Sequence, residues 1–358
     1  MTYKETLFFV GKCLTITHEE ENRKAIEQKI IDKTVDWDSV VKLSTGHYVF
    51  PALYCNLKRA GFLHHLPNDL VGYMEHITNL NRERNQQIIE QAKEINELLL
   101  TNNITPIFLK GTGNLLDNLY DDIAERMLGD IDFLVSKNHF DTTIQVLKEN
   151  GYYEKLKNSI DNTILNRHYP KMVKKDKIGA IEVHYKMITN EKNFNYHTVK
   201  QHLKKTTNNI TVLSNEDQVL MTCFNKQLND RSQWYKNVAL RNSYDLYLLS
   251  EKTSIIKAIS NLKNPIISNY LTNFVASTSL FFNTPKSLEY AKTTNTRKFI
   301  QKQLTLIDNA KKNKINKKLW NLYFLHKLRL TIILKSFYNK QYRNYVLATI
   351  LKKIKPNS

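Results

Sequence analysis

The most constraining feature of this sequence is a short apolar run that carries two aspartates, ERMLGDIDFLV at residues 125–135. Side chains alternate between the two faces of a β-strand, so the run predicts a strand in which Ile131 and Phe133 enter the core while Asp130 and Asp132 share the opposite face. Burying carboxylates is costly unless they are paired or bind a metal. The chain therefore places two carboxylates at the end of a core strand, where they either hold a metal or face solvent.

Strand-like and helix-like segments alternate around this run and indicate a small α/β unit. One strand precedes the run, a helix that ends at Gly151 follows it, and two further strands come after that helix. The expected segments are ITPIFLKG (104–111), NLLDNLYDD (114–122), DIDFLV (130–135), FDTTIQVLKENG (140–151), YPKMVKK (169–175) and AIEVHYKM (180–187).

Both flanks of this unit are predicted to be helical. The chain has only nine Gly and seven Pro in 358 residues, which argues against a loop-rich all-β fold. Apolar residues recur at helical spacing over residues 73–103, and helical patterns resume near Asn215. We therefore expect an α+β, mostly helical fold in three parts: an N-terminal helical region at 1–103, an α/β core at 104–190, and a C-terminal helical domain with a basic tail at 191–358.

Three pieces of the α/β unit carry residues suited to phosphate and metal chemistry. Gly111 and Thr112 follow a strand at the start of a helix, where backbone N–H groups bind anions. The aspartate pair offers the oxygen ligands that Mg²⁺ prefers. Glu182 and His184 share a face of a later strand, so Glu182 becomes a third carboxylate of the cluster if the two strands are neighbours. Taken singly, these pieces are better explained as an ordinary turn, a solvated strand end and an edge strand with a half-buried histidine.

In this order, a KG pair at a helix start, a DxD strand and a lone acid on a later strand resemble the polymerase-beta-type nucleotidyltransferases. The stretch IFLKGTGNLLDNLYDDIAERMLGDIDFLV more closely resembles a bacterial nucleotidyltransferase family whose core reads LKG, then an Arg, then GDIDLLV. Similar patterns, among them RHYPKMV, IEVHYKM and SYDL, extend the resemblance over roughly residues 1–250. The resemblance implies a small polymerase-beta-type α/β core flanked by the two helical regions.

The resemblance also implies a reaction and its residues. The reaction moves a nucleoside monophosphate from an NTP to a hydroxyl acceptor, releases pyrophosphate and depends on Mg²⁺ or Mn²⁺. Lys110 and Arg126 would contact the triphosphate. The implied catalytic and metal-binding residues are Asp130, Asp132 and Glu182, and the implied cofactor-binding residues are Lys110, Gly111, Thr112, Arg126 and His184.

The sequence departs from the family pattern at two places. The wider superfamily has Gly-Ser at the phosphate turn, where this chain has Gly111-Thr112. Relatives often carry a His near residues 225–227, which read Asn-Lys-Gln here. Asp245, in SYDLYLL, lies on an expected helix from which it would reach the cleft or instead form a surface pair or cap.

The positive charge of the chain is concentrated near its C-terminus. Net charge is +19, and residues 297–358 hold sixteen Lys or Arg against one acid, Asp308. Such a surface attracts phosphate backbones or anionic lipid headgroups, although a composition rich in Lys, Asn and Ile also explains it. The alternatives are a toxin-type nucleotidyltransferase of a toxin–antitoxin system that modifies tRNA, and a non-catalytic protein with a relic core whose basic tail binds nucleic acid. A tail lying on an anionic membrane is a further alternative.

The cysteines and the hydropathy pattern give an expectation for the cellular compartment of the protein. The three cysteines, Cys13, Cys55 and Cys223, are odd in number and far apart, which fits a reducing compartment. No uninterrupted apolar run reaches the length of a membrane span. We therefore expect a cytoplasmic protein with no membrane span.

Overall fold

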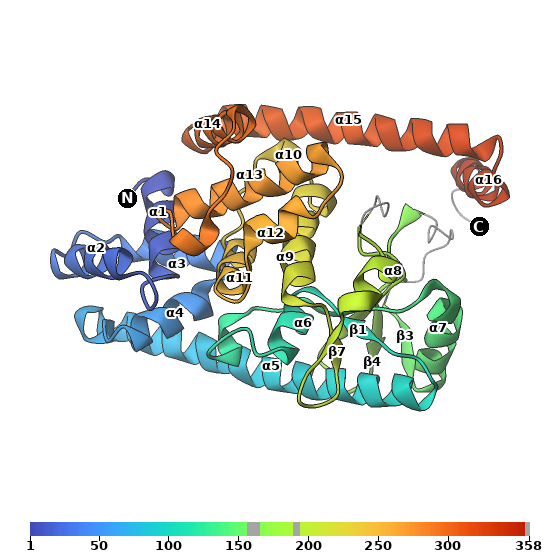
Figure 1. Cartoon of the computed structure of the whole chain (residues 1–358), viewed down its shortest axis with the longest axis horizontal. Helices are drawn as coiled ribbons and strands as arrows, with labels where there is room; N and C mark the ends of the chain where they lie inside the picture. Colours follow the sequence, from blue (N-terminus) through green and yellow to red (C-terminus); the bar gives the residue numbers. More distant parts are fainter. Residues whose placement is uncertain (156–164, 189–193, 355–358) are drawn as a thin grey trace.

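The computed structural model of the chain describes residues 1–155, 165–188 and 194–354. Over these residues it contains a mixed seven-stranded sheet and a larger number of helices, which confirms the expected α+β, mostly helical fold (Figure 1). None of the helices in these ranges combines the length and the apolar character needed to cross a bilayer.

The N-terminal part is helical, as expected. Its last helix, α5, has 34 residues and runs along one edge of the molecule, past both the helical part and the sheet (Figure 1). Buried Ile88, Ile95 and Leu99 recur at helical spacing on the side of α5 that faces the core. The α-helices are α1 (Tyr3–Cys13), α2 (Glu20–Ile31), α3 (Trp37–Gly46), α4 (Phe50–Arg59) and α5 (Asn68–Thr101), followed after β1 by α6 (Lys110–Leu116).

The sheet has the strand order β3-β4-β5-β2-β1-β7-β6. At its centre β2 pairs in parallel with β5 and antiparallel with β1, and β1 pairs in parallel with β7. Because β6 and β7 follow residue 190, the sheet extends beyond the segment expected as the core. The strands are β1 (Ile107–Phe108), β2 (Asp130–Leu134), β3 (Tyr152–Glu154), β4 (Met172–Lys174), β5 (Ala180–His184), β6 (Lys204–Lys205) and β7 (Thr211–Val212), with α7 (Phe140–Glu149) between β2 and β3.

The helix expected at 114–122 is placed differently in the structure. It is α6, which begins at Lys110, directly after the strand, because the amide of Gly113 already bonds to the carbonyl of Leu109 (3.0 Å). It ends at Leu116, since Asn118 adopts a left-handed φ of 52° that a helix cannot continue. Lys110 and Gly111 therefore belong to the first turn of a helix.

The C-terminal part packs on the N-terminal helices through a shared apolar core. This core joins α1–α4 with α9, α11 and α13, and a second core lies between the sheet and α5 and α7. Asn22 of α2 donates to the carbonyl of Phe282, 260 residues later (2.9 Å). The helices are α8 (Tyr196–Val199), α9 (Asn215–Phe224), a π-helical turn (Asn225–Asn229), α10 (Ser232–Tyr235), α11 (Leu240–Ser250), α12 (Ile255–Ser260), α13 (Pro265–Phe281), α14 (Thr294–Asp308), α15 (Ala310–Ser336) and α16 (Lys340–Ile354).

Candidate active site

Two neighbouring strands bring the predicted acidic residues together. Ile131 and Phe133 of β2 are fully buried, as the alternation predicted. Parallel pairing sets Asp132 of β2 directly opposite Glu182 of β5. His184, two residues after Glu182, lies on the same face. The strands are thus neighbours, and Glu182 is the third carboxylate of the cluster.

Asp132, Glu182 and His184 form a compact and largely buried group. One ligand atom from each lies within 4.8 Å of the others. The Nε2 atom of His184 is 2.8 Å from Asp132 Oδ1 and 3.4 Å from Glu182 Oε2. Burial alone would raise the pKa of Asp132, but the charge of Lys110 and the contact with His184 outweigh burial and hold this pKa well below its usual value. The group therefore presents an ionised carboxylate.

Two lysine ammonium groups offset two of the three carboxylate charges. Lys110 Nζ lies 2.6 Å from Asp132 Oδ1 and 3.9 Å from Glu182 Oε2. Lys171 Nζ lies 2.6 Å from Asp130 Oδ2 and 3.3 Å from Glu182 Oε1. Asp130 is thus joined to the other carboxylates through Lys171. Two carboxylates with an imidazole nitrogen beside them are donors suited to Mg²⁺ or Mn²⁺, and the positions of the two ammonium groups show that this site attracts cations.

The first turn of α6, which follows β1, lies beside these carboxylates. Lys110 has a left-handed φ of 54°, a conformation that costs free energy in a residue other than Gly and that gathers at functional sites. A Cβ on Gly111 would lie 2.6 Å from Leu128 Cδ2, so a larger residue there would require the Leu128 side chain to shift. The hydroxyl of Thr112 donates to the carbonyl of Asp130 (3.0 Å) and so ties the turn to β2. Lys110 and Gly111 line the cleft, whereas Thr112 fastens the turn.

Arg126 is fixed at the edge of the cleft by a buried ion pair. Its Nε atom donates to both carboxylate oxygens of Asp245 at 2.9 and 3.1 Å, and its Nη1 atom donates to the carbonyl of Met127 (2.7 Å). The hydroxyl of Tyr120 donates to the same carboxylate (2.7 Å). Burial alone would lower the pKa of Arg126, but Asp245 raises it. Asp245 therefore reaches the cleft and fixes the orientation of Arg126.

A single cleft joins these elements. It lies between the first turn of α6, the start of β2, and the C-terminal helices α9 and α11. Glu182 and His184 are not among the lining residues; they adjoin Asp132, to which His184 is hydrogen-bonded. The lining residues are Lys110, Gly111, Arg126, Leu128, Gly129, Asp130, Asp132, Met221, Thr222, Asn225, Asp230, Arg241, Asn242 and Asp245.

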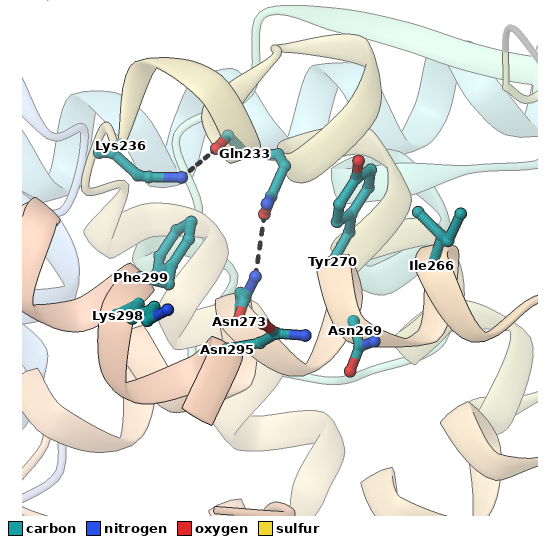
Figure 2. Close-up of a pocket in the computed structure, with 9 residues that line it drawn as sticks. All are labelled: Gln233, Lys236, Ile266, Asn269, Tyr270, Asn273, Asn295, Lys298 and Phe299. Atoms are coloured by element: carbon teal, nitrogen blue, oxygen red, sulfur yellow. Dashed lines mark hydrogen bonds between the residues drawn. The ribbon is translucent and has the colours of Figure 1, made fainter. Parts of the chain in front are cut away.

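A second hollow, between α10, α13 and α14, has different chemistry (Figure 2). Lys236 and Lys298 line it together with carboxamides, and the Asn273 amide donates to the side-chain oxygen of Gln233 (3.2 Å). No carboxylate or imidazole is among its lining residues in the described chain, so it offers no ligand set for a divalent metal. The cleft at the sheet is therefore the candidate active site.

The prediction from sequence missed two residues of the site. Lys171 bridges Asp130 and Glu182, and His168 Nε2 lies 3.8 Å from Glu182 Oε2, with its ring centroid 5.0 Å from that of His184. Both belong to the segment RHYPKMV, which carried part of the family resemblance. The pattern was visible, but nothing in the sequence shows that this segment passes beside β5.

Comparison with known protein families covers the part of the chain that forms the sheet and the cleft. A family model described as an uncharacterised nucleotidyltransferase matches residues 33–260, which include the sheet, the cleft and α11. A search of the curated proteins gave no match.

Proposed function

The chain belongs to this nucleotidyltransferase family, and from that premise we propose that it moves a nucleoside monophosphate from an NTP to a hydroxyl acceptor. The acceptor oxygen forms a bond to the α-phosphorus, the bond from that phosphorus to the bridging oxygen breaks, and pyrophosphate leaves. One observation carries the proposal: Asp130, Asp132 and Glu182 converge from two paired strands beside the glycine turn at Gly111.

Asp130, Asp132 and Glu182 would hold Mg²⁺ or Mn²⁺, with His184 as a nitrogen donor beside them. Bound there, a divalent ion would activate the acceptor hydroxyl and neutralise charge on the triphosphate. The observation behind this assignment is the donor set itself, with ligand atoms of Asp132, Glu182 and His184 within 4.8 Å of one another.

The remaining residues of the cleft would position the triphosphate. Lys110 stands at the first turn of α6 and Arg126 is held by Asp245, so both cations point from fixed elements toward one cleft. Preorganised cations of this kind stabilise the charge that shifts to the leaving pyrophosphate. Glu182, whose carboxylate adjoins Lys171, would accept the proton of the acceptor hydroxyl.

The test of the proposal is the Asp132→Asn variant, with Asp141→Asn as control because Asp141 is an exposed acid on α7. Pyrophosphate release from each of the four NTPs is measured, and the folded state is checked by circular dichroism. We expect Asp132→Asn to lose turnover and the shift of the melting temperature that Mn²⁺ gives the wild type, while Asp141→Asn keeps both. Turnover at the wild-type rate in a folded Asp132→Asn variant would rule out this site.

The acceptor is identified in a second assay. Radiolabelled NTPs are incubated with the protein and with total tRNA, a protein extract or a small-molecule extract. Label retained on RNA would assign the tRNA-modifying, toxin-type activity, and label on a small molecule or protein would assign a different acceptor.

A further inference from the structure

The C-terminal arm, defined here as α15 and α16 with their connecting loop (310–354), exposes an unusual amount of apolar surface. Fourteen of the 23 large hydrophobic side chains that are exposed in the described part of the chain belong to it. Monomeric soluble proteins rarely leave such a patch uncovered, so a partner surface is expected there. These side chains are Ile315, Leu319, Leu322, Tyr323, Leu325, Leu328, Leu330, Ile333, Leu334, Phe337, Tyr338, Leu347, Ile350 and Leu351.

Part of the exposed apolar surface of α15 forms a stripe, defined here by Leu319, Leu330 and Ile333, while Leu325 and Leu328 are exposed on other sides of the helix. Leu319, Leu330 and Ile333 are 61%, 58% and 49% exposed, and their spacing puts them on one helix face. A different face of α15 carries Phe324, whose ring packs against Trp234 of α10 with centroids 5.2 Å apart. α15 forms an outer edge of the molecule (Figure 1), and the accessibility of the three side chains shows that the stripe is open to solvent.

The charge of the arm has one sign only. Residues 310–351 contain ten Lys or Arg and no Asp or Glu. Within the described chain none of these cations forms an ion pair, and the nearest preceding acid, Asp308, already pairs with Lys4 of α1 (2.9 Å). The arm therefore presents aliphatic side chains together with uncompensated positive charge.

We propose that the arm docks on the surface of a bilayer that contains anionic phospholipids. Exposed apolar side chains can enter the headgroup boundary of a bilayer, and the Lys and Arg among them can lie beside the lipid phosphates. Eleven of the fourteen exposed side chains are aliphatic and cannot stack on bases, which disfavours nucleic acid as the occupant. A second copy is disfavoured because pairing two arms would bring like charges together.

The test uses the full chain and sedimentation with vesicles of phosphatidylglycerol and phosphatidylcholine in equal parts, compared with vesicles of phosphatidylcholine alone. The variant is Leu319→Glu/Leu330→Glu on the stripe. Its matched control, Ile31→Glu/Leu80→Glu, makes the same changes at exposed positions of α2 and α5. We expect the wild type and the control to sediment with the anionic vesicles alone, less so at high salt, and the stripe variant to bind at least about tenfold more weakly.

Three results would overturn the proposal. The first is no sedimentation with anionic vesicles. The second is equal binding of the stripe variant, which would leave only non-specific attraction between charges. The third is a dimer, or a complex with double-stranded RNA, that the stripe variant loses while vesicle binding is absent in every protein.

Discussion

Replacement of Asp245 by Asn is the sharpest test of how the cleft is built. The Asp245 and Arg126 side chains are 3% and 7% exposed and form the ion pair at 2.9 Å. The Asn keeps an acceptor but removes the charge, so the guanidinium stays buried without a counterion. Breaking a buried pair from one side costs about 3–5 kcal/mol, and we expect a loss near the lower end, about 3 kcal/mol, in the free energy of unfolding.

The control for this experiment is Asp230→Asn at the same cleft. Asp230 is 46% exposed and pairs with Lys226 of the preceding turn at 3.3 Å, an exposed pair worth about 0.3–0.5 kcal/mol. Urea unfolding followed by circular dichroism at neutral pH gives both values. A loss below about 1 kcal/mol for Asp245→Asn would refute the argument that a buried charge pair fixes Arg126. We also expect the KM for the NTP to rise in Asp245→Asn.

Three further predictions follow from local geometry. Gly113→Ala should destabilise the fold by about 1–3 kcal/mol because its Cβ would lie 2.6 Å from the Phe108 carbonyl oxygen. Gly72→Ala on α5 has open space around its Cβ and should stabilise the fold by about 0.5–1 kcal/mol. The midpoints of urea unfolding of the two variants test both values. Burial, with a smaller effect of a nearby lysine, lowers the pKa of His47 to about 4, below its unfolded value near 6.5. The wild type should therefore lose about 2 kcal/mol between pH 7.5 and pH 5 that a His47→Gln variant keeps, and equal pH profiles of the two proteins would contradict this. Lys171→Met should tighten Mn²⁺ binding without nucleotide by roughly threefold in calorimetry, since an ammonium beside Asp130 and Glu182 is removed, and unchanged or weaker binding would count against that role.

The acidic part of the site was predictable because it depends on local rules. Alternation in DIDFLV sends Ile131 and Phe133 inward, which leaves the two aspartates on the other face. The same alternation puts Glu182 and His184 together on β5. The order of strands and helices then made β2 and β5 plausible neighbours, which the parallel register confirms.

The rest of the site depends on contacts between distant parts of the chain. Asp245 meets Arg126 across 119 residues, and Lys171 meets Asp130 across 41. The local sequence around an aspartate on a helix does not distinguish a surface ion pair from a buried one. The packing of α11 against the cleft determines that the Asp245 pair is buried. β6 and β7 have two residues each, too few to show any period; β7 joins the sheet by pairing with β1, and β6 joins it by pairing with β7.

The lysines of the site connect its electrostatics to its proposed reaction. The three carboxylates carry three negative charges, and the positive charges of Lys110 and Lys171 offset two of them. The cluster is therefore close to neutral when neither metal nor nucleotide is bound. An isolated buried group of three carboxylates would be costly, because each ionised group resists desolvation and repels the others. Under the proposed function, a triphosphate in the cleft would give Lys110, which lines the cleft, an alternative anionic partner. Lys110 would then move from carboxylate to phosphate without its charge becoming unpaired, while a divalent cation takes over the carboxylates. On this reasoning nucleotide and metal should strengthen each other's binding, and Lys110 is the group through which the two are coupled.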